Sequence, residues 1–98
     1  MSRSLRLHPA AQRELDEAAA YYDAESPGLG SAFLREFEHA LQQIRAFPEA
    51  APVGLGSVRV RVLVTFPYSL HYALLDDAVL VLSLAHHSRR PFYWRDRQ

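Results

Sequence analysis

The fold is decided where the chain reads Val58-Arg59-Val60-Arg61-Val62-Leu63-Val64-Thr65. Every second residue up to Val64 is valine, and this period of two predicts a β-strand whose valines all face one side. The opposite side of the strand is then formed by the residues between them: Arg59, Arg61, Leu63 and Thr65. Upstream of this stretch the apolar residues recur at a spacing near four, so the chain changes here from helix to strand.

Two amphipathic helices are predicted upstream, separated by almost no linker. The first covers residues 9–25 and begins at Pro9, because a helix tolerates proline best at its first position. Ser26 is expected to cap the second helix, with Pro27 at its first position and Pro48 ending it. The apolar stripe of the first helix is Ala11, Leu15, Ala18, Ala19 and Tyr22. The stripe of the second is Phe33, Phe37, Ala40, Leu41, Ile44 and Phe47. Such a pair forms an antiparallel helical hairpin.

Further strands are predicted on either side of these segments. Residues 5–7 form a short first strand, and residues 68–75 form a strand after the break at Pro67. Residues 78–85 are almost continuously aliphatic, which is typical of a central strand covered on both faces. We therefore expect a single α+β domain spanning residues 1–98, with two layers and the order β-α-α-β-β-β. Its antiparallel sheet carries the helical hairpin on one face, because neither layer can bury its apolar side alone.

Composition excludes several classes of site. The chain has no cysteine, so disulfides, thiolate nucleophiles and cysteine zinc sites are absent. No H-E-x-x-H pattern or comparable spacing is present, so we expect no metal and no cofactor. The N-terminus lacks a secretory apolar region, and no apolar run approaches the roughly 20 residues of a membrane span. These features predict a cytoplasmic protein that does not enter a membrane.

The net charge of zero hides an asymmetry between the two halves. Residues 1–58 hold five arginines and eight acidic residues, whereas residues 59–98 hold six arginines and three acidic residues. The second half is therefore the expected docking region for an acidic partner or a polyanion. The chain has no lysine, which is as readily a genomic bias as a functional choice.

Several motifs resemble the RelE/ParE superfamily of small bacterial toxins, and the resemblance spans nearly the whole chain in order. The tail, Arg89-Arg90-Pro91-Phe92-Tyr93-Trp94, closely resembles the ParE-like, "plasmid stabilisation" branch. The other motifs that carry the resemblance are His8-Pro9-Ala10-Ala11, Glu14-Leu15, Ala18-Ala19-Ala20-Tyr21-Tyr22, Ser26-Pro27-Gly28-Leu29-Gly30, Phe33-Leu34, Arg59-Val60-Arg61, Phe66-Pro67-Tyr68, His71-Tyr72, Asp76-Asp77, Val79-Leu80-Val81-Leu82 and Ala85-His86.

This resemblance implies the toxin of a type II toxin–antitoxin pair, in a hetero-oligomer with its cognate antitoxin. ParE-type members inhibit DNA gyrase by binding and are not enzymes, whereas RelE-type members are endoribonucleases that cut messenger RNA on the ribosome without a metal. One scaffold can host both activities. A third alternative is an inactive member that is retained only as a binding module.

The candidate site residues serve either activity. A ribonuclease could use His86 and His87 for proton transfer and Tyr93 for stacking or proton donation. Four arginines could hold the phosphate: Arg59, Arg61, Arg89 and Arg90. For binding of the target or the antitoxin, the candidates are Arg59, Arg61, Arg89, Arg90, Tyr93 and Trp94. The zero net charge and the lack of lysine favour the gyrase inhibitor, because RelE-type ribonucleases are typically more basic.

Each candidate also has a structural interpretation. Adjacent strand residues point to opposite faces, so one of His86 and His87 is expected to face the helices or a rim. Arg59 and Arg61 form either a binding surface or an ordinary solvated sheet face. We expect Trp94 to pack, Tyr93 to be partly exposed, and His71 to have a core or rim role.

Overall fold

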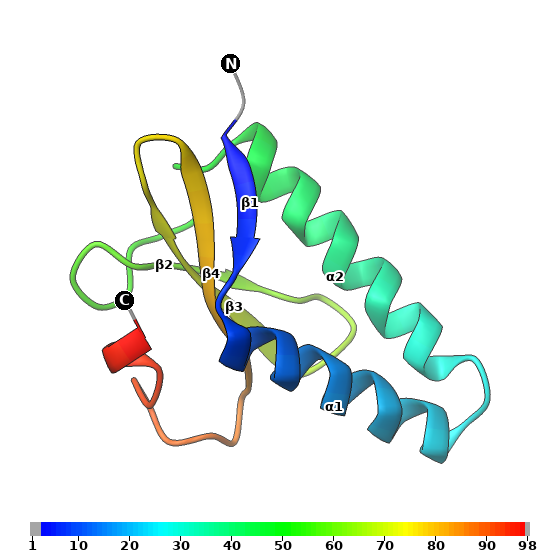
Figure 1. Ribbon diagram of the computed structural model, residues 1–98. Coiled ribbons are helices and arrows are strands. Elements are labelled where there is room, and N and C mark those ends of the chain that lie inside the picture. The colour runs from blue at the N-terminus through cyan, green and yellow to red at the C-terminus, as the bar shows by residue number, and fades with distance from the viewer. Residues whose placement is uncertain (1–2, 98) are drawn as a thin grey trace.

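A computed structural model describes residues 3–97, and its elements follow the predicted order (Figure 1). The elements are β1 (Ser4–Leu7), α1 (Pro9–Glu25), α2 (Leu29–Ala46), β2 (Arg59–Val62), β3 (Tyr68–Leu74), β4 (Ala78–His86) and a 3₁₀ turn (Arg95–Arg97). The strands form one sheet in the order β1-β4-β3-β2. The hairpin of α1 and α2 covers one face of this sheet, which confirms the predicted two-layer α+β class.

The sheet is mixed rather than wholly antiparallel. Strands β2, β3 and β4 form an antiparallel meander, whereas β1 pairs parallel to β4 from Ser4↔Ala78 to Leu7↔Val81. No tight turn joins β1 to β4, because the whole helical hairpin lies between them in sequence, so nothing imposes antiparallel pairing. β1 covers only the first part of β4, and residues 82–86 have no strand on that side among the described residues.

The junction between the helices differs from the prediction. Ser26 does not cap α2 but ends α1, where its backbone N–H donates to the Tyr22 carbonyl. α2 begins at Leu29, after Gly28, whose φ of 87° lies in the left-handed region that favours glycine. The chain needs this left-handed residue to reverse direction so soon after α1, and Asp23 then accepts a hydrogen bond of 2.8 Å from the Gly30 N–H.

The main core lies between the hairpin and the sheet, and most of the predicted stripes contribute to it. Phe33, Phe37, Ala40 and Ile44 are buried as expected. Phe47 is 70% exposed, so its predicted core position is wrong. The reason is that α2 ends at Ala46 and the Phe47 backbone has left the helical region, which turns its side chain out of the stripe.

A second, smaller core lies on the sheet face away from the helices. It consists of Val58, Ala73, Leu82 and Trp94, and it is covered by the C-terminal tail, residues 87–97. The valine face predicted for residues 58–64 belongs to this side only in part, since Val62 is 53% and Val64 is 90% exposed. β2 ends at Val62, so Val64 lies beyond the strand, whereas Leu63, on the side opposite the valines, packs in the main core. In the part of the chain that the structure describes, no helix is long and apolar enough to cross a membrane.

The two glycines of the junction provide a test of the hairpin packing. A Cβ at Gly30 would lie 2.5 Å from the Ala19 carbonyl oxygen, whereas a Cβ at Gly28 would meet nothing within 4 Å. We expect Gly30→Ala to lower the free energy of unfolding by about 3 kcal/mol, because a backbone atom must move. Gly28→Ala is expected to cost only about 1 kcal/mol, from its left-handed backbone.

Urea unfolding of both variants measures the difference. Equal losses, or a gain in stability from Gly30→Ala such as alanine normally provides inside a helix, would contradict the close approach of the two helices.

Candidate functional site

A single carboxylate on α1 joins the helix, the sheet and the tail. The Glu14 side chain is only 14% exposed. It accepts hydrogen bonds from the Leu84 N–H at 3.1 Å and the Tyr93 hydroxyl at 2.6 Å, and two from the Arg97 guanidinium at 2.9 and 3.1 Å. Such bidentate, charge-assisted bonds are the strong ones in proteins. Glu14 therefore anchors the tail to the rest of the fold.

The same cluster closes the part of β4 that β1 leaves uncovered. Arg97 donates to the Leu82 carbonyl at 3.0 Å, while Glu14 accepts from the Leu84 N–H. A paired glutamate and arginine thus satisfy the backbone groups that a further strand would otherwise bind. Unpaired strand edges invite association with other chains, and this edge is protected by side chains.

Glu14 belongs to a motif that carries the family resemblance, but the sequence did not mark it as a site residue. Its position held a signal, because Glu14 lies three residues after Ala11 and four before Ala18, on the buried side of α1. An acidic residue within an apolar stripe needs a partner. The partners lie some 70 to 83 residues away along the chain, so the sequence alone could not identify them.

Tyr93 contacts three charged side chains: Glu14, Arg89 and Arg97. The Arg89 guanidinium lies over the Tyr93 ring, 3.9 Å from the ring centre. The Arg97 guanidinium lies 4.9 Å from the same point. Burial, and then the hydrogen bond to Glu14, raise the pKa of the Tyr93 hydroxyl far above its usual value. Tyr93 is therefore a neutral hydrogen-bond donor whose proton is already committed to Glu14.

Trp94 and His71 form the support beneath the tail. Trp94 is 2% exposed, and its ring stacks on that of His71 with centroids 4.5 Å apart. Burial lowers the pKa of His71 to about 4, an effect that the charge of Glu14 partly offsets. His71 is thus neutral at pH 7, and its Nδ1 lies 2.8 Å from the Ser83 hydroxyl. These positions agree with the expected packing of Trp94 and the core or rim role of His71.

The structure brings six of the eight predicted site residues together around one pocket of about 280 Å³. These residues are His86, His87, Arg89, Arg90, Tyr93 and Trp94. His86 is half-buried, with its ring 5.1 Å from Tyr68 and its Nδ1 2.7 Å from the Ser88 hydroxyl. His87 is exposed, with its Nε2 3.0 Å from the Ser69 hydroxyl. His86 thus takes the rim position expected for one of the two histidines.

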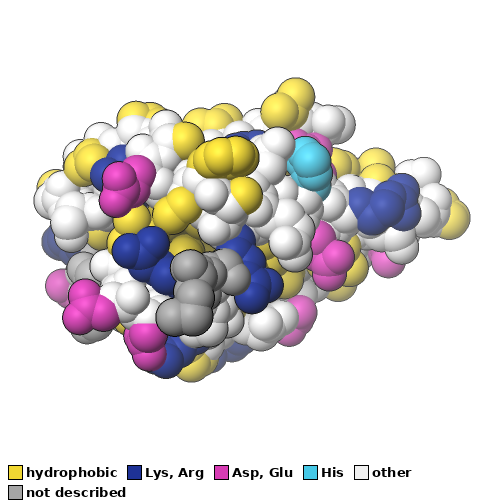
Figure 2. Space-filling model, turned by 90° about the horizontal axis from the view of Figure 1, so that it is seen from above, with side chains coloured by type: hydrophobic (Ala, Val, Ile, Leu, Met, Phe, Trp, Pro, Cys, Tyr) yellow, Lys and Arg dark blue, Asp and Glu magenta, His cyan; other side chains and the backbone are white. Residues whose placement is uncertain are grey.

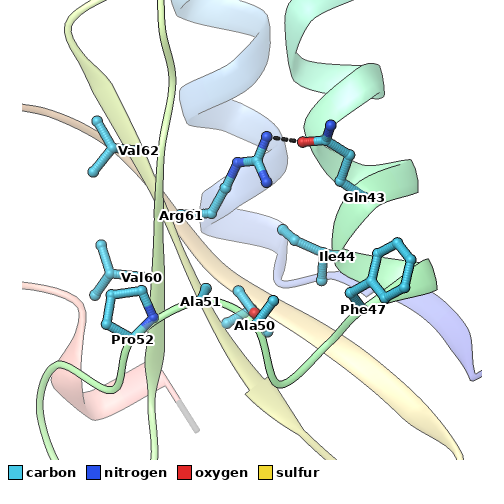
Figure 3. Close-up of a pocket in the computed structure, with 10 residues that line it drawn as sticks. Gln43, Ile44, Phe47, Ala50, Ala51, Pro52, Val60, Arg61 and Val62 are labelled. Carbon is cyan, nitrogen blue, oxygen red and sulfur yellow. Dashed lines mark hydrogen bonds between the residues drawn. The ribbon is translucent and has the colours of Figure 1, made fainter.

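Arg59 and Arg61 lie elsewhere, on the side of β2 that faces the helices. Arg59 donates to the carbonyls of Glu49 and Ala51, at 3.0 and 2.7 Å. Arg61 points toward α2 and donates to the Gln43 side chain (Figure 3). Neither arginine shares the tail pocket, so of the four arginines proposed for phosphate binding only Arg89 and Arg90 lie with the two histidines.

Arg61 instead forms part of a groove of about 480 Å³ between the end of α2 and β2 (Figure 3). The groove is lined by Gln43, Ile44, Phe47, Ala50, Ala51, Pro52, Val60, Arg61, Val62 and Tyr72. Most of these side chains are apolar, and two of them, Phe47 and Val62, are more than half exposed. Figure 2 views the molecule from above, from the end where α2 terminates in Figure 1. Exposed hydrophobic side chains are mixed with arginines and acidic residues on this face. Across residues 3–97, no three His, Asp or Glu side chains lie close enough to hold a metal ion.

Comparison with known proteins places this fold. A search of curated protein sequences finds no match. A solved structure described as "Chromosomal ParDE TA system from P. aeruginosa" has a similar fold, with a TM-score of 0.76 at 16% sequence identity. The similarity covers 86% of this chain and 95% of the other. A family model described as "ParE toxin of type II toxin-antitoxin system, parDE" matches residues 5–91, and the chain therefore belongs to the ParE family of type II toxins.

Proposed function

We propose that this ParE-family toxin arrests growth in the cytoplasm by binding and inhibiting DNA gyrase, and that a cognate antitoxin neutralises it in a hetero-oligomer. Family membership supports gyrase as the target, because inhibition by binding is the activity expected of ParE-type members. The toxin then needs a shaped surface rather than a catalytic centre.

The observation that carries this proposal is the engagement of the tail by Glu14. The Tyr93 hydroxyl and the Arg97 guanidinium both bind that carboxylate, and Arg89 lies against the Tyr93 ring. A general acid must be able to release its proton to the substrate. The Tyr93 hydroxyl instead donates a hydrogen bond to Glu14, and the pKa of Tyr93 is strongly raised. Polar groups satisfied in this way make the tail a rigid binding element.

The groove beside α2 is our candidate for the antitoxin. Antitoxin segments that fold on binding typically place the apolar face of a helix in such a groove. Phe47 and Val62 offer exposed apolar contacts, and Arg61 places a guanidinium in the wall. A partner helix with an acidic residue beside its apolar face would complement both features, since opposite charges across an interface select the partner.

The tail pocket supports a second candidate, a metal-independent ribonuclease. His86, His87, Arg89 and Arg90 line one cavity, which could hold a phosphate next to groups able to transfer protons. The separate location of Arg59 and Arg61 and the engagement of Tyr93 favour the gyrase inhibitor over this alternative.

A supercoiling assay separates the two candidates. Purified toxin is expected to inhibit gyrase in proportion to its concentration, and the cognate antitoxin is expected to restore supercoiling. Primer extension on messenger RNA from a translating extract is expected to reveal no new cuts. Uninhibited gyrase at high toxin excess, together with cuts at codon positions, would instead establish the ribonuclease.

The groove is tested with two exposed aromatics, Phe47 inside it and Tyr21 outside it. Phe47→Ser is expected to weaken antitoxin binding by roughly tenfold or more, as removal of an aromatic anchor does, and to leave gyrase inhibition intact. Tyr21→Ser is the matched control and should leave both unchanged. Titration calorimetry with the purified antitoxin measures the affinity, and equal affinities of the two variants would reject the groove as its site.

A further inference from the structure

We propose that the outer surface of the tail, formed by Arg90, Phe92 and Arg95, is the hot spot through which the toxin docks on an acidic surface of its target protein. This inference rests on the proposed function and adds the surface and the chemistry of its partner. Three features of the tail support it: an unusual backbone at Phe92, a rigid support beneath it, and unpaired positive charge around it.

Phe92 combines exposure with an unfavourable backbone. Its φ of 59° makes it the one non-glycine residue with a positive φ among residues 3–97, and its side chain is 44% exposed. Bulky side chains rarely adopt this conformation, and such outliers gather at functional sites. Phe92 lies outside both core clusters, so core packing does not explain why glycine is absent at this turn.

The turn is held in place from below. The Arg95 backbone N–H and guanidinium both donate to the Phe92 carbonyl, at 3.1 and 3.3 Å. The Phe92 ring meets the buried Trp94 ring edge to face at 6.1 Å, and Trp94 in turn stacks on His71 of β3. An aromatic stack therefore runs from the sheet to the surface and presents Phe92 in one orientation. A contact surface that is already ordered binds more tightly, because less entropy is lost on association.

Two arginines near Phe92 carry unpaired positive charge: Arg90 lines the same pocket, and the Arg95 guanidinium donates to the Phe92 carbonyl. Arg90 and Arg95 are exposed and form no ion pair within residues 3–97, whereas Arg97 and Arg89 are drawn toward Glu14. Asp96 is the only acidic residue of the tail. Arginines beside an aromatic ring are the composition typical of protein hot spots, and their charge calls for carboxylates on the partner.

This surface is distinct from the groove assigned to the antitoxin. The tail, orange to red in Figure 1, packs on the sheet face away from the helices, whereas the groove lies between α2 and β2. Substitutions in the tail should therefore reduce toxicity without reducing antitoxin binding.

The test measures growth arrest after induction without the antitoxin, antitoxin affinity, and the melting temperature of the purified chain. Phe92→Gly removes the ring and relieves the backbone, so its melting temperature is expected to be unchanged or higher. Its potency in growth arrest is expected to fall at least roughly tenfold, and that of Arg90→Glu by a similar factor. Both variants should bind the antitoxin within about threefold of the parent chain, because the groove is intact.

The controls are Tyr21→Ser for the exposed ring and Arg35→Glu for the exposed charge, and both should arrest growth normally. Full potency of Phe92→Gly and Arg90→Glu, or equal losses in the controls, would overturn the proposal. So would a loss of potency that is accompanied by lower stability and weaker antitoxin binding. The growth assay reports toxicity whichever target protein the toxin inhibits. If the chain arrests growth but leaves gyrase active, only the assignment of gyrase as the target is refuted.

A labelled DNA duplex and a labelled single-stranded RNA test the other polyanionic partners. We expect no binding at physiological salt by the parent chain. Nucleic-acid binding that Arg90→Glu abolishes would overturn the assignment of a protein partner.

Discussion

The architecture of this toxin depends on the hydrogen bonds and the ion pair that the Glu14 carboxylate forms. β1 is too short to pair with all of β4, so backbone groups near the end of β4 need partners that no strand provides. Glu14 and Arg97 supply those partners and bind each other, and Tyr93 donates to the same carboxylate. One residue of α1 thereby fixes the sheet edge and the tail together. Breaking such a buried pair by removing one partner is strongly destabilising, because the remaining charge is left uncompensated.

The anchored tail divides the molecule into surfaces with different chemistry. On one side, the second core and the tail hold Trp94 and His71 in a stack that ends at an exposed phenylalanine between arginines. On the other, the end of α2 and β2 leave an apolar groove with one arginine in its wall. Under the proposed function, the target and the antitoxin would each use one of these surfaces, so that each could be optimised without disturbing the other.

Local patterns were sufficient to predict most of the fold. The change of period at residue 58 predicted the order of helices and strands, because burial on one face imposes a spacing near four on helices and of two on strands. One error fell where a distant segment decides the outcome, because the parallel pairing of β1 depends on β4. The others, the left-handed Gly28 in place of a cap at Ser26 and the outward turn of Phe47, fell at helix ends, where a shift of one or two residues redirects the side chains.

The site was predictable to a similar depth. Composition directed attention to the arginines and aromatics of residues 89–94, and the structure gathers them with His86 and His87 around one pocket. Periodicity placed Arg59 and Arg61 on one side of a strand but could not say that this side faces the helices. Glu14 was missed because its partners are separated from it by most of the chain, although its position within an apolar stripe marked it as a residue in need of one.

Hydrogen exchange at the Leu84 amide tests the central role of Glu14 most directly. This amide lies on an edge that no strand covers among the described residues, and a side-chain carboxylate is its acceptor. We predict that this amide exchanges as slowly as the strand-paired amides of β4, and that Glu14→Ala raises its exchange rate toward that of an exposed loop amide. Rapid exchange in the parent chain, or slow exchange that survives Glu14→Ala, would contradict the central role of Glu14.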